Sequence, residues 1–432
     1  MKKFICIVMA ALMIIGLSAC GTQNSQKQEA AAEGFQPALD TAASCKIVVA
    51  GSYNNFEALE AAFDHFNEYY PNVELTYTKR DDYKKIIGTA LEGNDAPNIY
   101  VAHSWMVGNE QYATVLSHAE NLADPALGLD LDCIRPNIIL NMENGELPMV
   151  PIFATTHGML VNNSLFESEE LSVPTTYSEL VSTCKTLREK GYANPMLGYF
   201  NQSSSSLLYS IGFPCFCAEI SDDAEAVKNL NALDLSAREY MRSSLETAKR
   251  FIDDGCIDLQ ACAEIEDNYE AVIYRFFEGD VPMMICTGDT VSGTLKRESQ
   301  SEAFIAEPFS YSFVPIPVSD DGAYFLDTPS LQFAVNKDCS DLEMTNEFMR
   351  FLITSQELSE MAQIKRLVSP TKDLSFDNVY APFGQIPSSR IISPEAIGLM
   401  DDPIVQFRLA LYSVGTGEMS VDDAVAQFGQ FE

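Results

Sequence analysis

The most constraining feature of the chain is a regular alternation of short apolar runs with amphipathic stretches in its first hundred residues. Cys45–Ala50 and Asn98–Ala102 have the length and apolar character of buried strands, and Val73–Tyr77 alternates apolar with polar residues. Between them, residues 56–70 and 81–91 carry apolar side chains at helical spacing. Strand–helix–strand–helix–strand over so short a distance predicts a doubly wound parallel sheet.

The same patterns continue along the chain and predict an α/β protein of two or three core-bearing units, given its 432 residues. Thr176 and Glu179 have the spacing of a capping box at the start of a helix. Residues 221–280 are predicted to be mostly helical. Further strands are predicted at Leu147–Phe153, Leu160–Asn162, Val281–Cys286 and Leu331–Val335, an extended segment at Phe313–Val318, and helices at Thr345–Thr354, Gln356–Gln363 and Val421–Phe428.

The charge balance excludes whole classes of partner. There are 27 Lys and Arg against 62 Asp and Glu, which gives a formal net charge of −35. Such a surface repels the phosphates of nucleic acids, so no nucleic-acid partner is expected. It also repels anionic lipid, so any attachment to a membrane must be hydrophobic or covalent.

The N-terminus predicts export and a lipid anchor. Met1–Lys3 is basic, Phe4–Leu17 is apolar but too short to span a bilayer, and Leu17-Ser18-Ala19-Cys20 resembles the lipobox of bacterial lipoproteins. We expect residues 1–19 to be a signal peptide and residues 20–43 to be a lipidated Cys20 followed by a flexible tether. An ordinary signal peptide cleaved elsewhere, or a core helix, is the alternative.

Nine cysteines remain after Cys6 and Cys20 are set aside. An odd number in an exported protein leaves at least one unpaired. Most lie in apolar or mixed segments, where cysteine behaves as a small hydrophobe. Free thiols are therefore favoured over disulfides, and no metal site is expected, although the disulfide state stays open.

Six short motifs in a fixed order resemble the extracellular solute-binding proteins of ABC importers, in the carbohydrate-binding group akin to maltose-binding protein. Among them are the sequences YPNVEL, GNDAPNIYV and VPTTYSEL. Together the motifs extend over most of the chain. They lie in Tyr70–Leu75, Asp82–Val101, Asn144–Phe166, Val173–Leu180, Phe277–Ile285 and Glu347–Glu357.

The resemblance implies a periplasmic-binding-protein-like type II fold, with two doubly wound lobes joined by a multi-crossing hinge. Residues 44–152 and 322–368 would form lobe one, and residues 153–321 and 369–432 would form lobe two. It further implies a monomer without cofactor that captures a carbohydrate outside the cell and delivers it to an ABC permease. The only contact with the membrane would be the lipid anchor.

Two departures put the usual sugar preference of that family in doubt. A Trp often follows the strand and glycine after the Phe277–Ile285 motif, but here Gly288 precedes Asp289 and Thr290. The glycine pair expected before Leu331 is replaced by residues 327–330. Both changes fall near the ligand cleft that the resemblance implies.

A sugar binder needs aromatic platforms and hydrogen-bonding side chains, and in doubly wound lobes these lie on the loops that follow the strands. Each such residue could instead form a turn, pack into the core or brace the hinge. The predicted ligand contacts are Tyr53, Asn54, Ser104, Trp105, Thr156, His157, Asp289 and Asp327.

No catalytic motif occurs in the sequence, which lacks G-x-S-x-G, H-E-x-x-H, P-loop and C-x-x-C patterns, so an enzyme is not expected. The alternatives are a binding protein for a non-sugar solute, such as a polyamine or a peptide, and a surface-anchored glycosidase. The second would need two converging carboxylates, and no motif singles out such a pair.

Overall fold

The computed structural model describes residues 34–54, 56–142, 144–202, 206–266, 269–374, 376 and 378–431. The predicted signal peptide, the lipidated Cys20 and most of the 20–43 tether lie outside the described residues, as does Asn55. Pro37–Glu432 forms one compact unit. Within the described part of the chain, no helix has both the length and the apolarity needed to cross a bilayer.

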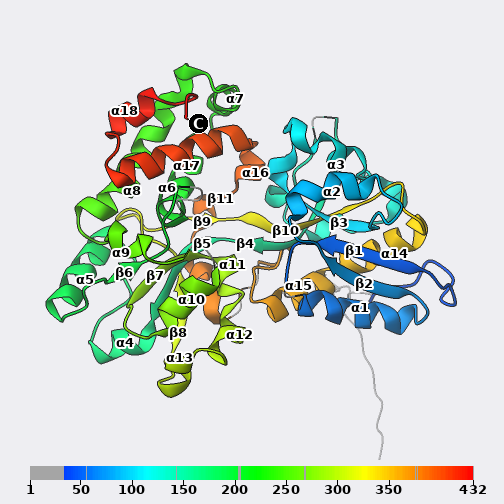
Figure 1. The fold of residues 1–432 in the computed structure, drawn as a ribbon, viewed down its shortest axis with the longest axis horizontal. Coiled ribbons are helices and arrows are strands. Elements are labelled where there is room, and N and C mark those ends of the chain that lie inside the picture. The colour runs from blue at the N-terminus through cyan, green and yellow to red at the C-terminus, as the bar shows by residue number, and fades with distance from the viewer. Residues whose placement is uncertain are drawn as a thin grey trace, which may run out of the picture. The chain divides into compact units, whose positions relative to one another are not determined.

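The first lobe is built on a five-stranded sheet in the order β2-β1-β3-β10-β4 (Figure 1). Strand β1 pairs in parallel with β2 and β3, which confirms the alternation read from the sequence, while β10 pairs antiparallel with β3 and β4. The strands are β1 (Lys46–Gly51), β2 (Glu74–Lys79), β3 (Ile99–Ala102), β4 (Val150–Thr155) and β10 (Thr328–Val335). The helices are α1 (Glu57–Tyr69), α2 (Tyr83–Leu91), α3 (Ala113–Ser117), α14 (Leu342–Leu352) and α15 (Ser355–Lys365).

The second lobe has a four-stranded sheet in the order β6-β7-β5-β8, surrounded by helices (Figure 1). The capping box at the start of α5 is present as predicted, with Thr176 and Glu179 each accepting from the other's backbone. The strands are β5 (His157–Asn162), β6 (Met196–Leu197), β7 (Met283–Thr287) and β8 (Tyr311–Val314). The helices are α4 (Asn163–Ser168), α5 (Tyr177–Glu189), α6 (Ser206–Ile220), α7 (Ala224–Asn231), α8 (Arg242–Asp253), α9 (Leu259–Ala263), α10 (Tyr269–Phe277), α11 (Gly288–Val291), α12 (Thr294–Glu298), α13 (Glu302–Ala306), α16 (Pro394–Ile397), α17 (Asp401–Thr416) and α18 (Val421–Ala426).

At two places a single residue links a strand of the first sheet to a strand outside it, and these are here called the first and second crossings. At the first crossing, Thr156 joins β4 to β5 of the second sheet. At the second crossing, Asp327 joins β10 to β9 (Phe325–Leu326), which pairs with β11 (Ile391–Ile392) in a separate two-stranded sheet. Further along, Val368 pairs with Ala154 of β4. These crossings lie within a few residues of the predicted boundaries after residues 152, 321 and 368, which stay predictions.

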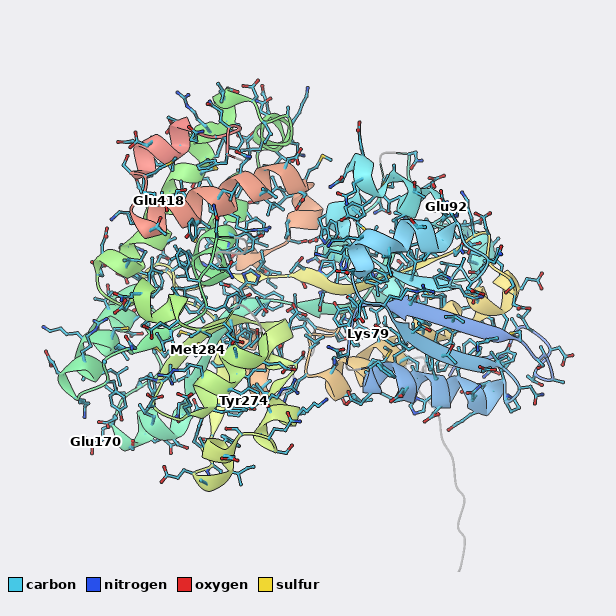
Figure 2. All side chains as sticks on the ribbon, viewed as in Figure 1. Lys79, Glu92, Glu170, Tyr274, Met284 and Glu418 are labelled. Atoms are coloured by element: carbon cyan, nitrogen blue, oxygen red, sulfur yellow. The ribbon has the colours of Figure 1, made fainter. Side chains whose placement is uncertain are left out.

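The acidic side chains spread over the outside of the lobes, as the net charge requires. Glu92, Glu170 and Glu418 are exposed and lie at the periphery, whereas Met284 of β7 is fully buried (Figure 2). The negative charge is thus a property of the surface.

A buried ion pair joins three separate chain segments at the second crossing. Arg135 donates from Nε and Nη2 to the two carboxylate oxygens of Asp327, at 2.8 and 2.7 Å. Its Nη1 donates to the carbonyl oxygens of Ser369 and Thr371, and Asn137 donates to Asp327 at 2.7 Å. Arg135 is 7% exposed and Asp327 is 0% exposed. Both charges are therefore removed from water but almost fully hydrogen-bonded.

Removing one partner of this pair should destabilise the protein strongly, because the other charge would stay buried and uncompensated. We expect Asp327→Ala to lower the free energy of unfolding by about 3–5 kcal/mol. Urea denaturation followed by circular dichroism measures this. The matched control is Asp95→Ala at an exposed carboxylate, expected to stay within about 0.5 kcal/mol of the parent. Equal effects from both variants would contradict the structural role of the pair.

Candidate ligand-binding site

The loop after β1 brings Tyr53 to the edge of the first sheet. A Cβ atom on Gly51 would lie 2.6 Å from the Tyr77 hydroxyl and 2.8 Å from Val101, so only glycine fits at this close approach. The Tyr53 backbone N–H then donates to the Tyr77 hydroxyl at 2.9 Å. The Tyr53 hydroxyl donates to the carbonyl oxygen of Ser330 on β10 at 3.2 Å. The backbone N–H and the side-chain hydroxyl of Tyr53 are thus both hydrogen-bonded, which holds the residue beside the first part of β10.

A second tight turn positions Asp289 from the other lobe. A Cβ on Gly288 would lie 2.7 Å from the Thr155 hydroxyl oxygen and 2.8 Å from that of Tyr380, so this position also requires glycine. Asp289 follows in the first turn of α11 and accepts a hydrogen bond from the Ser330 hydroxyl. Burial raises the pKa of Asp289, and the Ser330 hydrogen bond partly opposes that rise.

These contacts flank a cavity of about 500 Å³, here called cavity A, which is lined by residues from both lobes. This volume lies within the ~300–1,000 Å³ typical of small-molecule sites. Its aromatic lining is Tyr53, Phe56, Tyr77, Phe153, Tyr199 and Phe333. Its hydroxyl lining is Ser52, Thr287, Thr290, Ser292 and Ser330. Its charged lining is Glu270, Asp289, Lys296, Arg297 and Lys365.

The charged groups of cavity A come from both lobes. Arg297 is 5% exposed and is paired with Glu270. Lys365, at the end of α15, is half-buried, and burial is the main cause that lowers its pKa to about 8. Lys296 of α12 is exposed in the same cavity. Three basic and two acidic side chains therefore line cavity A.

A smaller cavity of about 250 Å³, here called cavity B, contains the only Trp of the chain. Trp105 is half-buried and stacks on His103, with ring centroids 5.2 Å apart at 17°. It meets Tyr112 edge-on at 4.9 Å, and the Lys84 ammonium lies 4.7 Å from its ring centroid. These neighbours fix the orientation of the indole without burying it in the core.

Two buried side-chain nitrogens of cavity B have no hydrogen-bond partner among the described residues. Gln332 accepts through Oε1 from the Ser104 backbone N–H and hydroxyl, at 3.0 and 3.1 Å. Its Nε2, like His157 Nδ1, is buried and has no hydrogen-bond partner among the described residues. Burial lowers the pKa of His157 to about 4 and raises that of Glu395 to about 7. His157 is thus neutral at pH 7, and the orphaned nitrogens can bond a polar ligand.

The two cavities lie on opposite faces of β10. Leu331 and Phe333 line cavity A, whereas Gln332 between them lines cavity B. Successive side chains of a strand point to opposite faces of a sheet. Ser330 contacts both Tyr53 and Asp289. It lies in the first part of β10, where the strand carries a β-bulge.

The residues predicted from the sequence divide between these two cavities. Tyr53, Asn54 and Asp289 line cavity A. Ser104, Trp105 and His157 line cavity B.

Two predicted contacts are corrected by the geometry. Asp327 is completely buried and its carboxylate is occupied by Arg135 and Asn137, so it braces the crossing instead of meeting a ligand. Thr156 is also 0% exposed, and its carbonyl oxygen accepts from the Gly288 N–H at 2.8 Å. Neither residue is among those that line cavity A or cavity B.

Several lining residues were not found from the sequence. Lys296, Arg297 and Lys365 lie on helices and belong to no motif that predicts a ligand contact. Glu395 and Arg408 reach cavity B from α16 and α17, and α17 itself was not predicted. Ligand contacts were predicted only on loops that follow strands, so residues on helices were missed. The sequence contains no local pattern that marks these helical residues as ligand contacts.

Among the residues that the structure describes, the cysteines form no disulfide and one cluster of possible metal ligands occurs. The structure shows all nine described cysteines as free thiols, as favoured from the sequence. His65 lies 3.3 Å from Glu357 and 3.7 Å from Glu360, a group that could hold an ion. An ordinary ion pair between α1 and α15 accounts for this group.

A family model described as bacterial extracellular solute-binding protein matches residues 61–381. Comparison with curated proteins gave no significant match.

Solved structures share the fold at low identity. RafE from Streptococcus pneumoniae, in its apo form, has 14% identity and a TM-score of 0.67 over 91% of this chain and 98% of its own. The GacH receptor of Streptomyces glaucescens, solved unliganded and with acarbose, has 18% identity and a TM-score of 0.65 over 90% and 97%. A sugar transporter from Bacillus licheniformis in complex with stachyose has 15% identity and a TM-score of 0.63 over 89% and 98%. The chain belongs to the bacterial extracellular solute-binding protein family and has its two-lobe type II fold.

Proposed function

We propose that the protein captures a carbohydrate in the cleft between its lobes, with cavity A as the principal site. The observation that carries the proposal is the lining of cavity A, which combines six aromatic residues with five residues that carry a Ser or Thr hydroxyl. A sugar has apolar C–H faces that pack on aromatic rings and a rim of hydroxyls that exchange hydrogen bonds. Cavity A offers both kinds of side chain within one cavity.

Cavity B, on the other face of β10, would be a second and separate place for sugar units. Trp105 offers an aromatic surface there, and Gln332 and His157 offer nitrogens that have no partner among the described residues. Structures of similar fold were solved with stachyose, raffinose and acarbose, which are oligosaccharides. This supports a saccharide ligand here and leaves its identity open.

Export with the signal peptide 1–19 and lipidation of Cys20 would anchor the protein outside the cell. The anchored protein would act as a monomer. A ligand that contacts both lobes favours the closed arrangement, and an ABC permease would recognise that state. The family assignment to extracellular solute-binding proteins supports this placement.

The composition of cavity A weighs against the alternatives. A polyamine would meet the ammonium groups of Lys296 and Lys365, and like charges repel. A glycosidase needs two carboxylates free to act on one bond. Of the two carboxylates lining cavity A, Glu270 is paired with Arg297.

Saccharide binding should stabilise the protein by mass action. At 100 times its Kd, a ligand adds about 2.7 kcal/mol to the free energy of unfolding. A thermal-shift screen against mono- and oligosaccharides should give a concentration-dependent rise in Tm for one class. A rise with spermidine or peptides, and none with any saccharide, would contradict the proposal.

Trp105 should behave as a ligand platform and not as a core residue. We expect Trp105→Ala to weaken binding of an oligosaccharide found in that screen by about 1–3 kcal/mol through lost apolar contact, measured by isothermal titration calorimetry. The control is Phe66→Ala at a fully buried ring, expected to cost about 3–5 kcal/mol of stability. If Trp105→Ala destabilises as much as Phe66→Ala and binds normally, Trp105 has no ligand role.

The lipid anchor has a direct test in the host cell. We expect Cys20→Ser to abolish lipidation, because only the thiol can form the thioether, and to leave an unprocessed precursor or release protein into the medium. Fractionation with [³H]palmitate labelling measures both. Cys45→Ser is the matched control and should stay labelled and membrane-bound. Normal retention of the Cys20 variant would rule out the anchor.

A further inference from the structure

Cys184 and Cys256 lie against each other in lobe two, although three helices separate them in the sequence. Cys184 is on α5, and Cys256 follows α8, with α6, α7 and α8 between them. Both side chains are 0% exposed, and both are thiols in the structure. We infer that this pair is a site of oxidative modification, at which a disulfide bond joins α5 to the segment after α8.

Contacts near the start of α5 hold this helix against the end of α8. The ring of Tyr177 packs on that of Phe251, with centroids 5.1 Å apart at 57°. The Tyr177 hydroxyl donates to Asp254 Oδ2 at 2.7 Å, and the Arg250 guanidinium lies 3.9 Å from the Tyr177 ring centroid. The first residue of α5 is thus fixed to the last turn of α8 and to the residue that follows it.

A second contact, near the end of α5, places the two cysteines opposite each other. Gly255 has a φ of +71°, and a Cβ atom there would lie 3.3 Å from Arg188 Nη1. Cys184 and Arg188 have the i, i+4 spacing of neighbours on one face of a helix, and Cys256 directly follows Gly255. The turn after α8 therefore carries Cys256 to the face of α5 that carries Cys184.

The two thiols are hydrogen-bonded to each other. This interaction is the main cause that lowers the pKa of Cys256, while burial acts in the opposite direction. None of the other described cysteines shares a hydrogen bond with a second thiol. Cys256 lies outside any helix or strand, so its backbone can adjust as the sulfurs approach the ~2.05 Å of an S–S bond. Proximity therefore selects this pair for a disulfide.

The modification is a thiol–disulfide exchange with a small disulfide oxidant, written R–S–S–R. The Cys256 thiol loses its proton, attacks one sulfur of the oxidant and releases one R–S⁻, which leaves a mixed disulfide. The Cys184 thiol then loses its proton, attacks Cys256 Sγ and releases the second R–S⁻. The protein loses two electrons and two protons, and the oxidant takes them up as two R–SH. Because both thiols are buried in the folded protein, the first step takes place during folding.

The environment of the protein and the position of the pair both favour this bond. The family is extracellular, and disulfides persist in oxidising environments outside the cytoplasm. The bond would close a loop that contains α6, α7 and α8, and a closed loop restricts the unfolded chain more than the folded one. Neither cysteine lines cavity A or cavity B. The cross-link would therefore stabilise lobe two and leave the proposed sugar sites as they are.

Peptide mapping of the full chain tests the inference. The protein is reduced in urea, refolded with oxidised and reduced glutathione, and alkylated with N-ethylmaleimide in denaturant. Mass spectrometry of its peptides should show Cys184 linked to Cys256 and the other cysteines alkylated. A second map, of protein alkylated directly in the cells that export it, removes the dependence on refolding.

Two variants serve as matched controls for the map. Cys184→Ala should abolish the linked peptide, because Cys256 then has no thiol within reach. Cys262→Ala, at another fully buried cysteine, should leave the linked peptide intact. If Cys184→Ala does not fold, the maps of the parent protein decide alone.

Thermal unfolding measures the effect of the bond. The Tm of the linked protein should fall by several degrees when dithiothreitol reduces it, whereas the reductant should leave the Tm of Cys184→Ala unchanged. Alkylation of both Cys184 and Cys256, adducts with glutathione only, or linkage of either cysteine to a third one overturns the inference. An equal Tm with and without reductant in the linked protein overturns the stabilising effect. None of these results bears on carbohydrate capture, which the thermal-shift screen tests.

Discussion

The buried pair between Arg135 and Asp327 is the interaction on which the arrangement of the cleft depends. It fixes the residue where the chain leaves β9 and enters β10, and it ties that point to the segment around Ser369 and Thr371. Strand β10 divides cavity A from cavity B, so the position of its first residues sets the walls of both. Because a buried charge without its partner is costly, the pair specifies one arrangement of these segments.

The fold was largely predictable, because its signals are local. Strand and helix periodicities from residue 45 to 102 and the Thr176 capping box need only neighbouring residues to be read, and both are present in the structure. Of the residues that line the two candidate cavities, those predicted from the sequence lie on loops after strands, as do Tyr53, Trp105 and Asp289, and their role as ligand contacts stays a prediction. Asp327 also follows a strand, but its partner Arg135 lies 192 positions away in the sequence. No local sequence pattern predicts such a buried ion pair, so Asp327 was predicted as a ligand contact. Lys296 and Lys365 were missed because they reach cavity A from helices of different lobes, which no local sequence pattern indicates.

The electrostatics of the exterior and of cavity A differ. The chain has 62 acidic against 27 basic residues, so its surface repels anionic lipid. Cavity A is lined by three basic and two acidic residues together with six aromatic ones. In the proposed function, the aromatic lining supplies contact area for the apolar faces of a sugar, and the polar side chains exchange hydrogen bonds with its hydroxyls.

The most direct test of the account is a crystal structure of the protein with a saccharide that raises its Tm. We predict ligand density in cavity A, with a sugar ring against the aromatic lining near Tyr53 and a sugar hydroxyl that donates to Asp289. Density confined to another surface, with cavity A filled only by water, would contradict it.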